Sequence, residues 1–78
     1  MREGDRVVVI EDVITTGGSA LRAAEAIQQS GATVSGILAL VDREEGGRAI
    51  LEAQGFQVIC LATLSELLDQ APAGAQAS

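Results

Sequence analysis

Two adjacent acids and a short loop rich in hydroxyl groups lie near the start of the chain, and both are of types that bind ligands. Glu11 and Asp12 follow the apolar run of residues 7–10, and residues 15–19 form a loop of two threonines, two glycines and a serine. Adjacent glycines let a backbone approach a ligand closely, and the N–H groups at the start of a helix attract anions. The spacing therefore predicts a phosphate site at loop 15–19.

The two carboxylates need a different partner, because they would repel a phosphate. Carboxylate oxygens accept hydrogen bonds from neighbouring hydroxyls, such as those of a ribose. The hydroxyls of Thr15, Thr16 and Ser19 add donors for the phosphate. The stretch therefore predicts a site for a ribose phosphate, with the sugar at Glu11 and Asp12 and the 5′-phosphate at the loop.

Each part of this pattern has a simpler explanation when it is taken alone. Two acids at a strand end are usually solvated, Thr-Gly-Gly is a weak turn signal, and Ser19 fits an ordinary helix N-cap. Their order after an apolar strand is more specific. Two other phosphate motifs do not fit, because the loop has no lysine of the Walker type and lacks the first spaced glycine of the dinucleotide fingerprint.

The elements that must position these residues follow from the hydropathy pattern. Apolar runs predict strands over residues 6–12, 33–42 and 56–62. Helices are predicted over residues 19–30, 47–54 and 63–70. Strands that alternate with helices favour a parallel sheet, so we expect an α/β fold with a partial doubly wound parallel sheet in the order β-α-β-α-β-α. Continuous apolar strands predict that both sheet faces are covered.

Local signals mark the ends of these helices. Gly31 and Gly55 fit helix C-caps, and Thr63 with Glu66 has the spacing of a capping box. We expect one domain over residues 1–70 and a flexible tail of small residues over 71–78.

Composition narrows the classes of function. The 78 residues carry a formal net charge of −6, with five arginines and no lysine or histidine, which argues against binding to nucleic acid. No apolar run is long enough to span a membrane, and no signal-peptide pattern opens the chain. Cys60 is the single cysteine and is interpreted as a small buried hydrophobe, so we expect no internal disulfide and no cysteine-based zinc site. We assign no metal-ligating residue. A reducing, cytoplasmic compartment fits these features.

The stretch EDVITTGGS, residues 11–19, resembles the phosphoribosyl-diphosphate motif of type I phosphoribosyltransferases. Both have an apolar strand, two acids, two apolar residues and a Thr/Gly loop. Within that group the stretch is most similar to orotate phosphoribosyltransferases, and LALVDREEGG, residues 38–47, resembles the next strand and turn of these enzymes. The resemblance extends to about Leu68.

The resemblance implies roles for individual residues. Phosphoribosyl diphosphate would be bound by Glu11, Asp12, Val13, Ile14, Thr15, Thr16, Gly17, Gly18 and Ser19. Glu11 and Asp12 would bind the ribose hydroxyls and act in catalysis, and Thr15 would also touch orotate. Arg43 would bind orotate, since a guanidinium offers several fixed donors to an anionic ring. Alternatively, Arg43 is a surface arginine that pairs with a neighbouring acid: Asp42, Glu44 or Glu45.

The activity that the resemblance implies is transfer of ribosyl 5-phosphate from phosphoribosyl diphosphate to orotate. The products would be orotidine 5′-monophosphate and pyrophosphate, in the synthesis of UMP. Mg²⁺ would be bound mainly through the pyrophosphate of the substrate. The full-length enzyme would be a cytoplasmic homodimer that binds neither nucleic acid nor membrane. Three alternatives stay open: a purine salvage enzyme of the same family, a regulator that senses a sugar phosphate without turnover, and a structural α/β segment.

The chain also departs from the family pattern. Type I enzymes have an N-terminal region, a loop that grips pyrophosphate and a mobile loop with basic residues, and none of these is recognisable here. We therefore expect the chain to be the C-terminal part of such an enzyme and to be inactive on its own.

Overall fold

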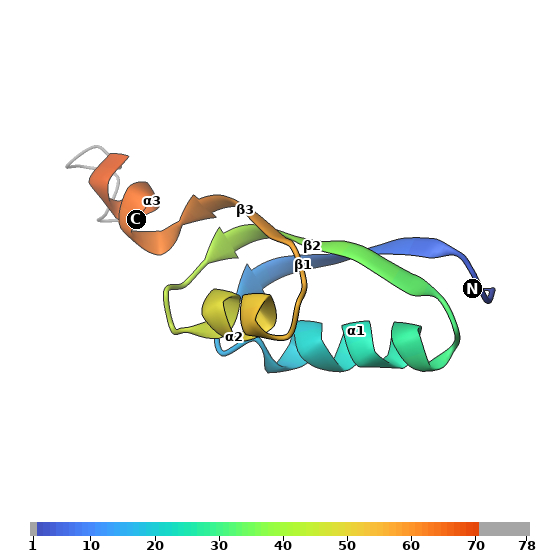
Figure 1. Cartoon of the computed structure of the whole chain (residues 1–78). Helices are drawn as coiled ribbons and strands as arrows, with labels where there is room; N and C mark the ends of the chain where they lie inside the picture. The colour runs from blue at the N-terminus through green and yellow to red at the C-terminus, as the bar shows by residue number, and fades with distance from the viewer. Residues whose placement is uncertain (1, 71–78) are drawn as a thin grey trace.

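The structure is a computed structural model of the 78-residue chain and describes residues 2–70. Three strands and three helices alternate along it: β1 (Arg6–Ile14), α1 (Gly18–Gln29), β2 (Thr33–Asp42), α2 (Gly47–Ala53), β3 (Val58–Thr63) and α3 (Leu64–Gln70). This confirms the predicted fold class and element order (Figure 1). The predicted tail over 71–78 lies outside the described residues.

The sheet is parallel and has the order β1-β2-β3. Ile14 at the end of β1 pairs with Asp42 at the end of β2, which pairs with Thr63 at the end of β3. The carboxyl ends of the strands therefore form one row. The segments that follow the three strands begin along the same edge of the sheet, where ligands bind in open α/β folds.

Helices α1 and α2 lie on the same face of the sheet (Figure 1). The strands follow one another across the sheet in one direction, so two crossovers of the same hand must put their helices on one face. Helix α1 packs on β1 and β2, and α2 packs on β3. The core between the helices and the sheet consists of Val9, Ile14, Ala20, Ala24, Ile27, Ala32, Ile37, Ala39, Leu51 and Val58.

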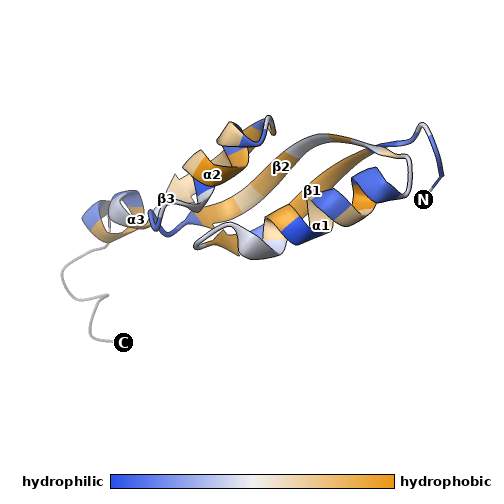
Figure 2. Ribbon diagram, turned by 60° about the horizontal axis from the view of Figure 1, so that its bottom comes forward, coloured by the Kyte–Doolittle hydropathy of each residue, from blue (hydrophilic) through white to orange (hydrophobic). Residues whose placement is uncertain are grey.

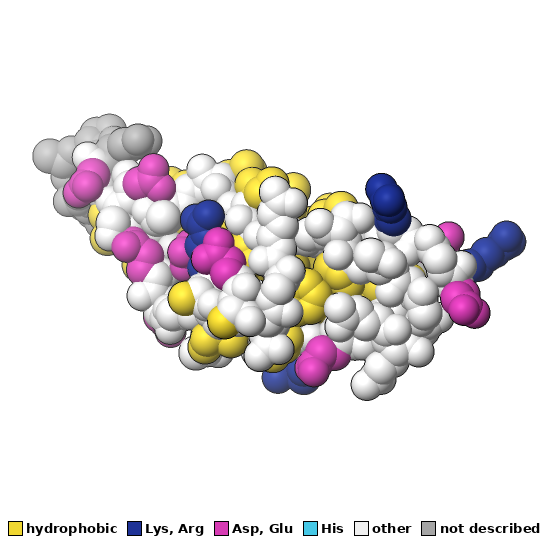
Figure 3. All heavy atoms as spheres, in the orientation of Figure 1, with side chains coloured by type: hydrophobic (Ala, Val, Ile, Leu, Met, Phe, Trp, Pro, Cys, Tyr) yellow, Lys and Arg dark blue, Asp and Glu magenta, His cyan; other side chains and the backbone are white. Residues whose placement is uncertain are grey.

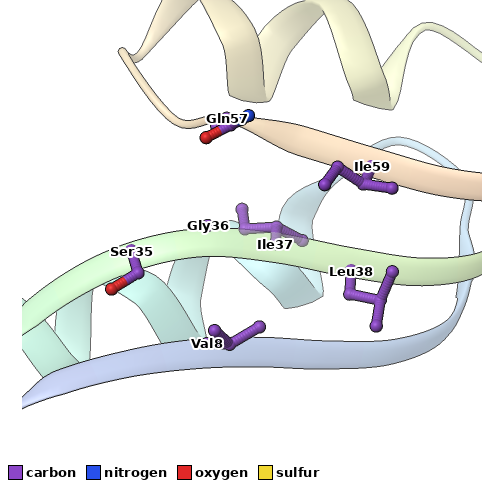
Figure 4. A pocket seen from close by; sticks show the side chains of 7 residues that line it. All are labelled: Val8, Ser35, Gly36, Ile37, Leu38, Gln57 and Ile59. Atoms are coloured by element: carbon purple, nitrogen blue, oxygen red, sulfur yellow. The ribbon is translucent and has the colours of Figure 1, made fainter.

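The opposite face of the sheet, which we call the outer face, contradicts the expectation that both faces are covered. Its large apolar side chains are exposed within residues 2–70: Val8, Ile10, Leu40, Ile59 and Leu61. Figure 2 shows how apolar the strands are compared with the mixed surface of α1. A shallow hollow of about 200 Å³ lies on this face (Figure 4). Its lining is Val8, Ser35, Gly36, Ile37, Leu38, Gln57 and Ile59.

The helix ends follow the sequence signals with one exception. Gly31 and Gly55 follow α1 and α2 with φ of 92° and 96°, a conformation that favours glycine, as predicted. Ser19 is not the N-cap of α1. Gly17 takes that position in the left-handed conformation, and Ser19 lies within the helix.

Helix α3 begins with the predicted capping box. The Thr63 N–H donates to Glu66 Oε1 at 2.9 Å, and the Glu66 N–H donates to Thr63 Oγ1 at 3.2 Å. Cys60 in β3 is partly buried against the core, and burial raises the pKa of its thiol, with Asp42 acting in the same direction. No helix in the described part of the chain is long and apolar enough to cross a membrane.

Candidate functional site

Strand β1 is longer than predicted, and this changes the arrangement of the two acids. The strand continues through Val13 to Ile14, because both residues pair with β2, so Glu11 and Asp12 lie within the strand and not at its end. The burial along the strand departs from strict alternation here, because Val9 and Ile14 are both buried in the core.

The two acids also differ in their surroundings. Glu11 is partly buried on the α1 side, where its Oε1 accepts a hydrogen bond of 3.3 Å from the Ser19 hydroxyl. Asp12 is exposed. The carboxylate of Asp12 is thus open to a ligand. To bind a ligand, Glu11 would have to give up its hydrogen bond from Ser19 or accept a second one beside it.

Loop 15–17 leads from β1 into α1. Thr15 and Thr16 are exposed, and Gly17 is buried with φ 85° and ψ −3°. The first N–H groups of a helix have no partner within the helix, and the macrodipole adds partial positive charge there. A small hollow of about 20 Å³ lies at this point, lined by Val13, Ile14, Thr15, Gly17, Ser19 and Ala20. The structure therefore brings the loop residues of the predicted phosphate site together at the start of a 12-residue helix.

The segment after β2, residues 43–47, forms a turn that we call turn 43–47. Asp42 is buried, and its Oδ1 accepts a hydrogen bond of 2.8 Å from the Glu44 N–H. Glu44 has φ 63°, and its Oε1 accepts a hydrogen bond of 2.7 Å from the Ser65 N–H. Hydrogen bonds from Ser65, first from its side chain and then from its backbone, lower the pKa of Glu44. The turn is thus tied to α3.

Arg43 lies beside the end of β1, because its N–H donates to the Ile14 carbonyl at 2.9 Å. Its Nε lies 3.4 Å from Glu45 Oε2, and both side chains are about half exposed. This is one of the surface pairs that the sequence left as an alternative. Exposed pairs contribute about 0–1 kcal/mol, so an anionic ligand can displace Glu45.

The sequence analysis did not single out Gly47, which joins turn 43–47 to loop 15–17. The Gly47 N–H donates to the Thr15 carbonyl at 3.1 Å. A Cβ atom at residue 47 would lie 2.5 Å from the Thr15 oxygen and 2.6 Å from the Gly17 nitrogen. The signal in the sequence is the second Gly-Gly pair, residues 46–47, which repeats the pair at 17–18.

Arg22 is a second residue that the sequence analysis missed. A Cβ atom at Gly18 would lie 3.3 Å from Arg22 Nη1, so the guanidinium lies over the start of α1. Among residues 2–70, the ion pairs involve Arg43 and Arg48 and not Arg22. The spacing of four residues from Gly18 could have revealed this cation, because residues four apart lie on one helix face.

Acidic side chains predominate at the end of the molecule toward α3. Figure 3 shows acidic side chains gathered toward α3, with a basic group among them. Within the described ranges, no three His, Cys, Asp or Glu side chains are placed to hold a metal ion together.

Residues 1–64 match the family model of the phosphoribosyl transferase domain, and the chain belongs to this family. The orotate phosphoribosyltransferase of Pyrococcus furiosus is 48% identical over 71 residues, which cover 91% of this chain and 39% of that protein. The orotate phosphoribosyltransferase of Aquifex aeolicus is 52% identical over 68 residues, covering 87% of this chain and 37% of that protein. The chain thus spans 37–39% of the length of these curated relatives.

A solved structure agrees in fold. The Mycobacterium tuberculosis orotate phosphoribosyltransferase in complex with 5-phospho-α-D-ribosyl 1-diphosphate matches with a TM-score of 0.76 and 42% identity. The match covers 80% of this chain and 37% of that one.

Proposed function

We propose that the chain carries the ribose-phosphate and orotate contacts of an orotate phosphoribosyltransferase. The observation that carries this proposal is the contact between turn 43–47 and loop 15–17, the loop that we propose as the phosphate cradle, because this contact brings the loop next to Arg43. The orotate enzymes among the relatives support the choice of base over a purine. The relative that was solved with phosphoribosyl diphosphate supports the choice of sugar phosphate.

The phosphoribosyl diphosphate contacts are assigned to consecutive residues. They are Glu11, Asp12, Val13, Ile14, Thr15, Thr16, Gly17, Gly18 and Ser19. The N–H groups of the loop and the start of α1 would bind the 5′-phosphate, helped by the hydroxyls of Thr16 and Ser19. The guanidinium of Arg22 would add the positive charge that the loop itself lacks. Asp12 is open to a ribose hydroxyl, and Glu11 would bind a second hydroxyl once Ser19 turns to the phosphate.

Orotate would lie between Thr15 and Arg43. The hydrogen bond from the Arg43 N–H to the Ile14 carbonyl holds the backbone of Arg43 next to the loop. A planar guanidinium can donate two parallel hydrogen bonds to a carboxylate or to neighbouring carbonyls. Arg43 would therefore exchange its pair with Glu45 for the orotate anion.

The proposed reaction forms a bond between the ribose C1′ and a ring nitrogen of orotate and breaks the bond from C1′ to the pyrophosphate oxygen. The electron pair of the broken bond leaves with pyrophosphate, and positive charge develops on the ribose ring. The carboxylates of Glu11 and Asp12 would stabilise that charge electrostatically. Carboxylate oxygens suit Mg²⁺, but the described residues offer no three-residue metal group, so the ion would be held mainly by the substrate. Bound Mg²⁺ would neutralise charge on the leaving pyrophosphate.

The wider context belongs to the same proposal. We place the activity in UMP synthesis in the cytoplasm, and we assign a homodimer to the full-length enzyme. The chain has no lysine or histidine, so basic groups for the pyrophosphate must come largely from elsewhere. The 78-residue chain alone should therefore bind the sugar phosphate without catalysing transfer.

A hybrid enzyme tests the proposal. The segment of the Pyrococcus furiosus enzyme that matches this chain over 71 residues is replaced by the chain. The hybrid should convert orotate at about 1–1,000 per second. Gly18→Val should abolish turnover, because the branched side chain intrudes on the phosphate site, and Ala26→Val on the exposed side of α1 should not. A folded hybrid that binds the sugar phosphate without turnover would favour a regulator, and preference for adenine would favour a purine enzyme.

A further inference from the structure

Gly47 lies in the first turn of α2 and is not among the proposed ligand contacts. The geometry points to Gly47 as a positioning residue, whose lack of a side chain lets α2 touch the phosphate loop and fix the loop in its phosphate-binding shape. This inference rests on the proposed function, because it concerns the same phosphate site.

The space at Gly47 is filled by atoms of the loop. A Cβ atom there would lie 2.5 Å from the Thr15 oxygen, 2.6 Å from the Gly17 nitrogen and 2.7 Å from Ile14 Cγ2. The first two are backbone atoms and cannot rotate away. Ile14 is only 2% exposed, so its side chain is fixed by the core. Any side chain at residue 47 must therefore displace the loop backbone or α2.

The contact is reciprocal. A Cβ atom at Gly17 would lie 3.0 Å from the Gly47 oxygen and 3.2 Å from its Cα. The Gly47 N–H also donates to the Thr15 carbonyl at 3.1 Å. Two glycines thus allow two backbones to meet directly, and a hydrogen bond fixes their distance.

Conformation does not explain why a glycine stands at this position. In the pair 46–47, only Gly46 has a positive φ, of 91°. Gly46 has open space around it, with no atom within 4 Å of a Cβ. The two glycines therefore have separate roles: Gly46 allows the chain to turn, and Gly47 allows the close approach.

A side chain at residue 47 would disturb the backbone N–H groups that are proposed to bind the phosphate. The Gly17 nitrogen is crowded by a Cβ at residue 47, and its N–H belongs to the group that would face the phosphate. Hydrogen bonds weaken steeply when their geometry is lost. Loss of one or two charge-assisted bonds corresponds to about 10-fold to several-hundred-fold weaker binding of ribose 5-phosphate.

The test compares three glycine variants of the 78-residue chain. Gly46→Ala and Gly55→Ala each put alanine at a positive φ, of 91° and 96°, with nothing within 4 Å, so they lower stability without filling the contact. Gly47→Ala fills the contact. Thermal unfolding gives the stability of each variant, and calorimetric titration gives the affinity for ribose 5-phosphate. We expect the affinity to fall only in Gly47→Ala. Equal affinities in Gly47→Ala and Gly55→Ala would overturn the inference.

A second measurement covers the case in which Gly47→Ala does not fold. In the unmodified chain, ¹⁵N-labelled amides are followed by NMR as ribose 5-phosphate is added. The Gly47 amide should shift together with those of Gly17 and Gly18, and the Gly55 amide should stay in place. A Gly47 amide that does not move while the loop amides shift would contradict the inference alone. No saturable shift at any loop amide would refute the proposed function, and the inference with it.

Discussion

Two helices of this chain begin in nearly the same way and carry opposite chemistry. Gly17 precedes α1 with φ 85° and ψ −3°, and Gly46 precedes α2 with φ 91° and ψ −6°. Each is followed by a second glycine. The first pair stands between threonines and a serine, whereas the second stands between two glutamates and an arginine. The same left-handed glycine conformation therefore precedes both helices at this sheet edge, but the neighbouring side chains differ.

The comparison explains why we assign the phosphate to only one of the two Gly-Gly helix starts. Loop 15–17 presents hydroxyl donors, and the long helix α1 follows it. Turn 43–47 presents Glu44 and Glu45, which would repel a phosphate, and α2 has only seven residues. The turn instead supports the loop through Gly47 and places Arg43 beside it. In the proposed function the two helix starts have different roles: the first would bind the sugar phosphate, and the second would shape the site and bind the base.

The largest effect should come from giving the loop the side chains of the turn. The double change Thr15→Glu and Thr16→Glu adds two negative charges next to the bound phosphate. Each like charge a few ångströms away costs several kcal/mol near a protein surface, so ribose 5-phosphate should bind about 100-fold more weakly or worse. Calorimetric titration measures this. The matched change Glu44→Gln and Glu45→Gln in the turn should not weaken binding, and a loss there equal to that in the loop would break the comparison.

The second prediction distinguishes the residue that binds the base from the residues that bind the sugar phosphate. In the hybrid enzyme, Arg43→Ala should lower kcat/KM for orotate by roughly 10-fold to several-hundred-fold, because one or two charge-assisted hydrogen bonds are lost. Affinity for the sugar phosphate should change little. Arg48→Ala is the control, because Arg48 is also about half exposed and pairs with Glu52 at 3.5 Å. If Arg43→Ala weakened the sugar phosphate and spared orotate, turn 43–47 would have no role in binding the base.

The smallest effect concerns the tie between turn 43–47 and α3. The pKa of Glu44 is lowered from its ordinary value of 4.5 by hydrogen bonds from Ser65, so the ionised form stabilises the fold. This contribution is present above about pH 4.5 and is lost as the pH falls through the lowered pKa. Glu44→Gln should therefore lower the melting temperature slightly at pH 7, and the two proteins should converge in acid. A difference that persists or grows in acid would show that the charge of Glu44 is irrelevant.

Most of the fold could be predicted from the sequence, because its signals are local. The apolar run of residues 33–42 gave the bounds of β2, and the Thr63–Glu66 spacing gave the start of α3. The end of β1 could not be predicted in the same way. Val13 and Ile14 follow two acids and look like the start of a loop, and only their pairing with β2 makes them strand.

In the candidate site too, local features could be predicted from the sequence and long-range contacts could not. Residues 15–19 could be predicted as a phosphate site because they are adjacent in sequence and their types suit a phosphate. Gly47 was missed because its role depends on contact with Thr15 and Gly17, about thirty residues earlier in the chain. The bare outer face was missed for a similar reason: apolar strands indicate that a sheet is covered, but not which segments cover it.

The most direct test of the account is an NMR titration of the unmodified 78-residue chain with ribose 5-phosphate. Two hollows described among residues 2–70 can be compared in this titration, because the larger of them, on the outer face, has a mainly apolar lining and the smaller lies at the loop. The account predicts saturable shifts of the amides of residues 16–19. Shifts centred instead on the outer face, at Val8 and Ile59, or no saturable shift at all, would contradict it.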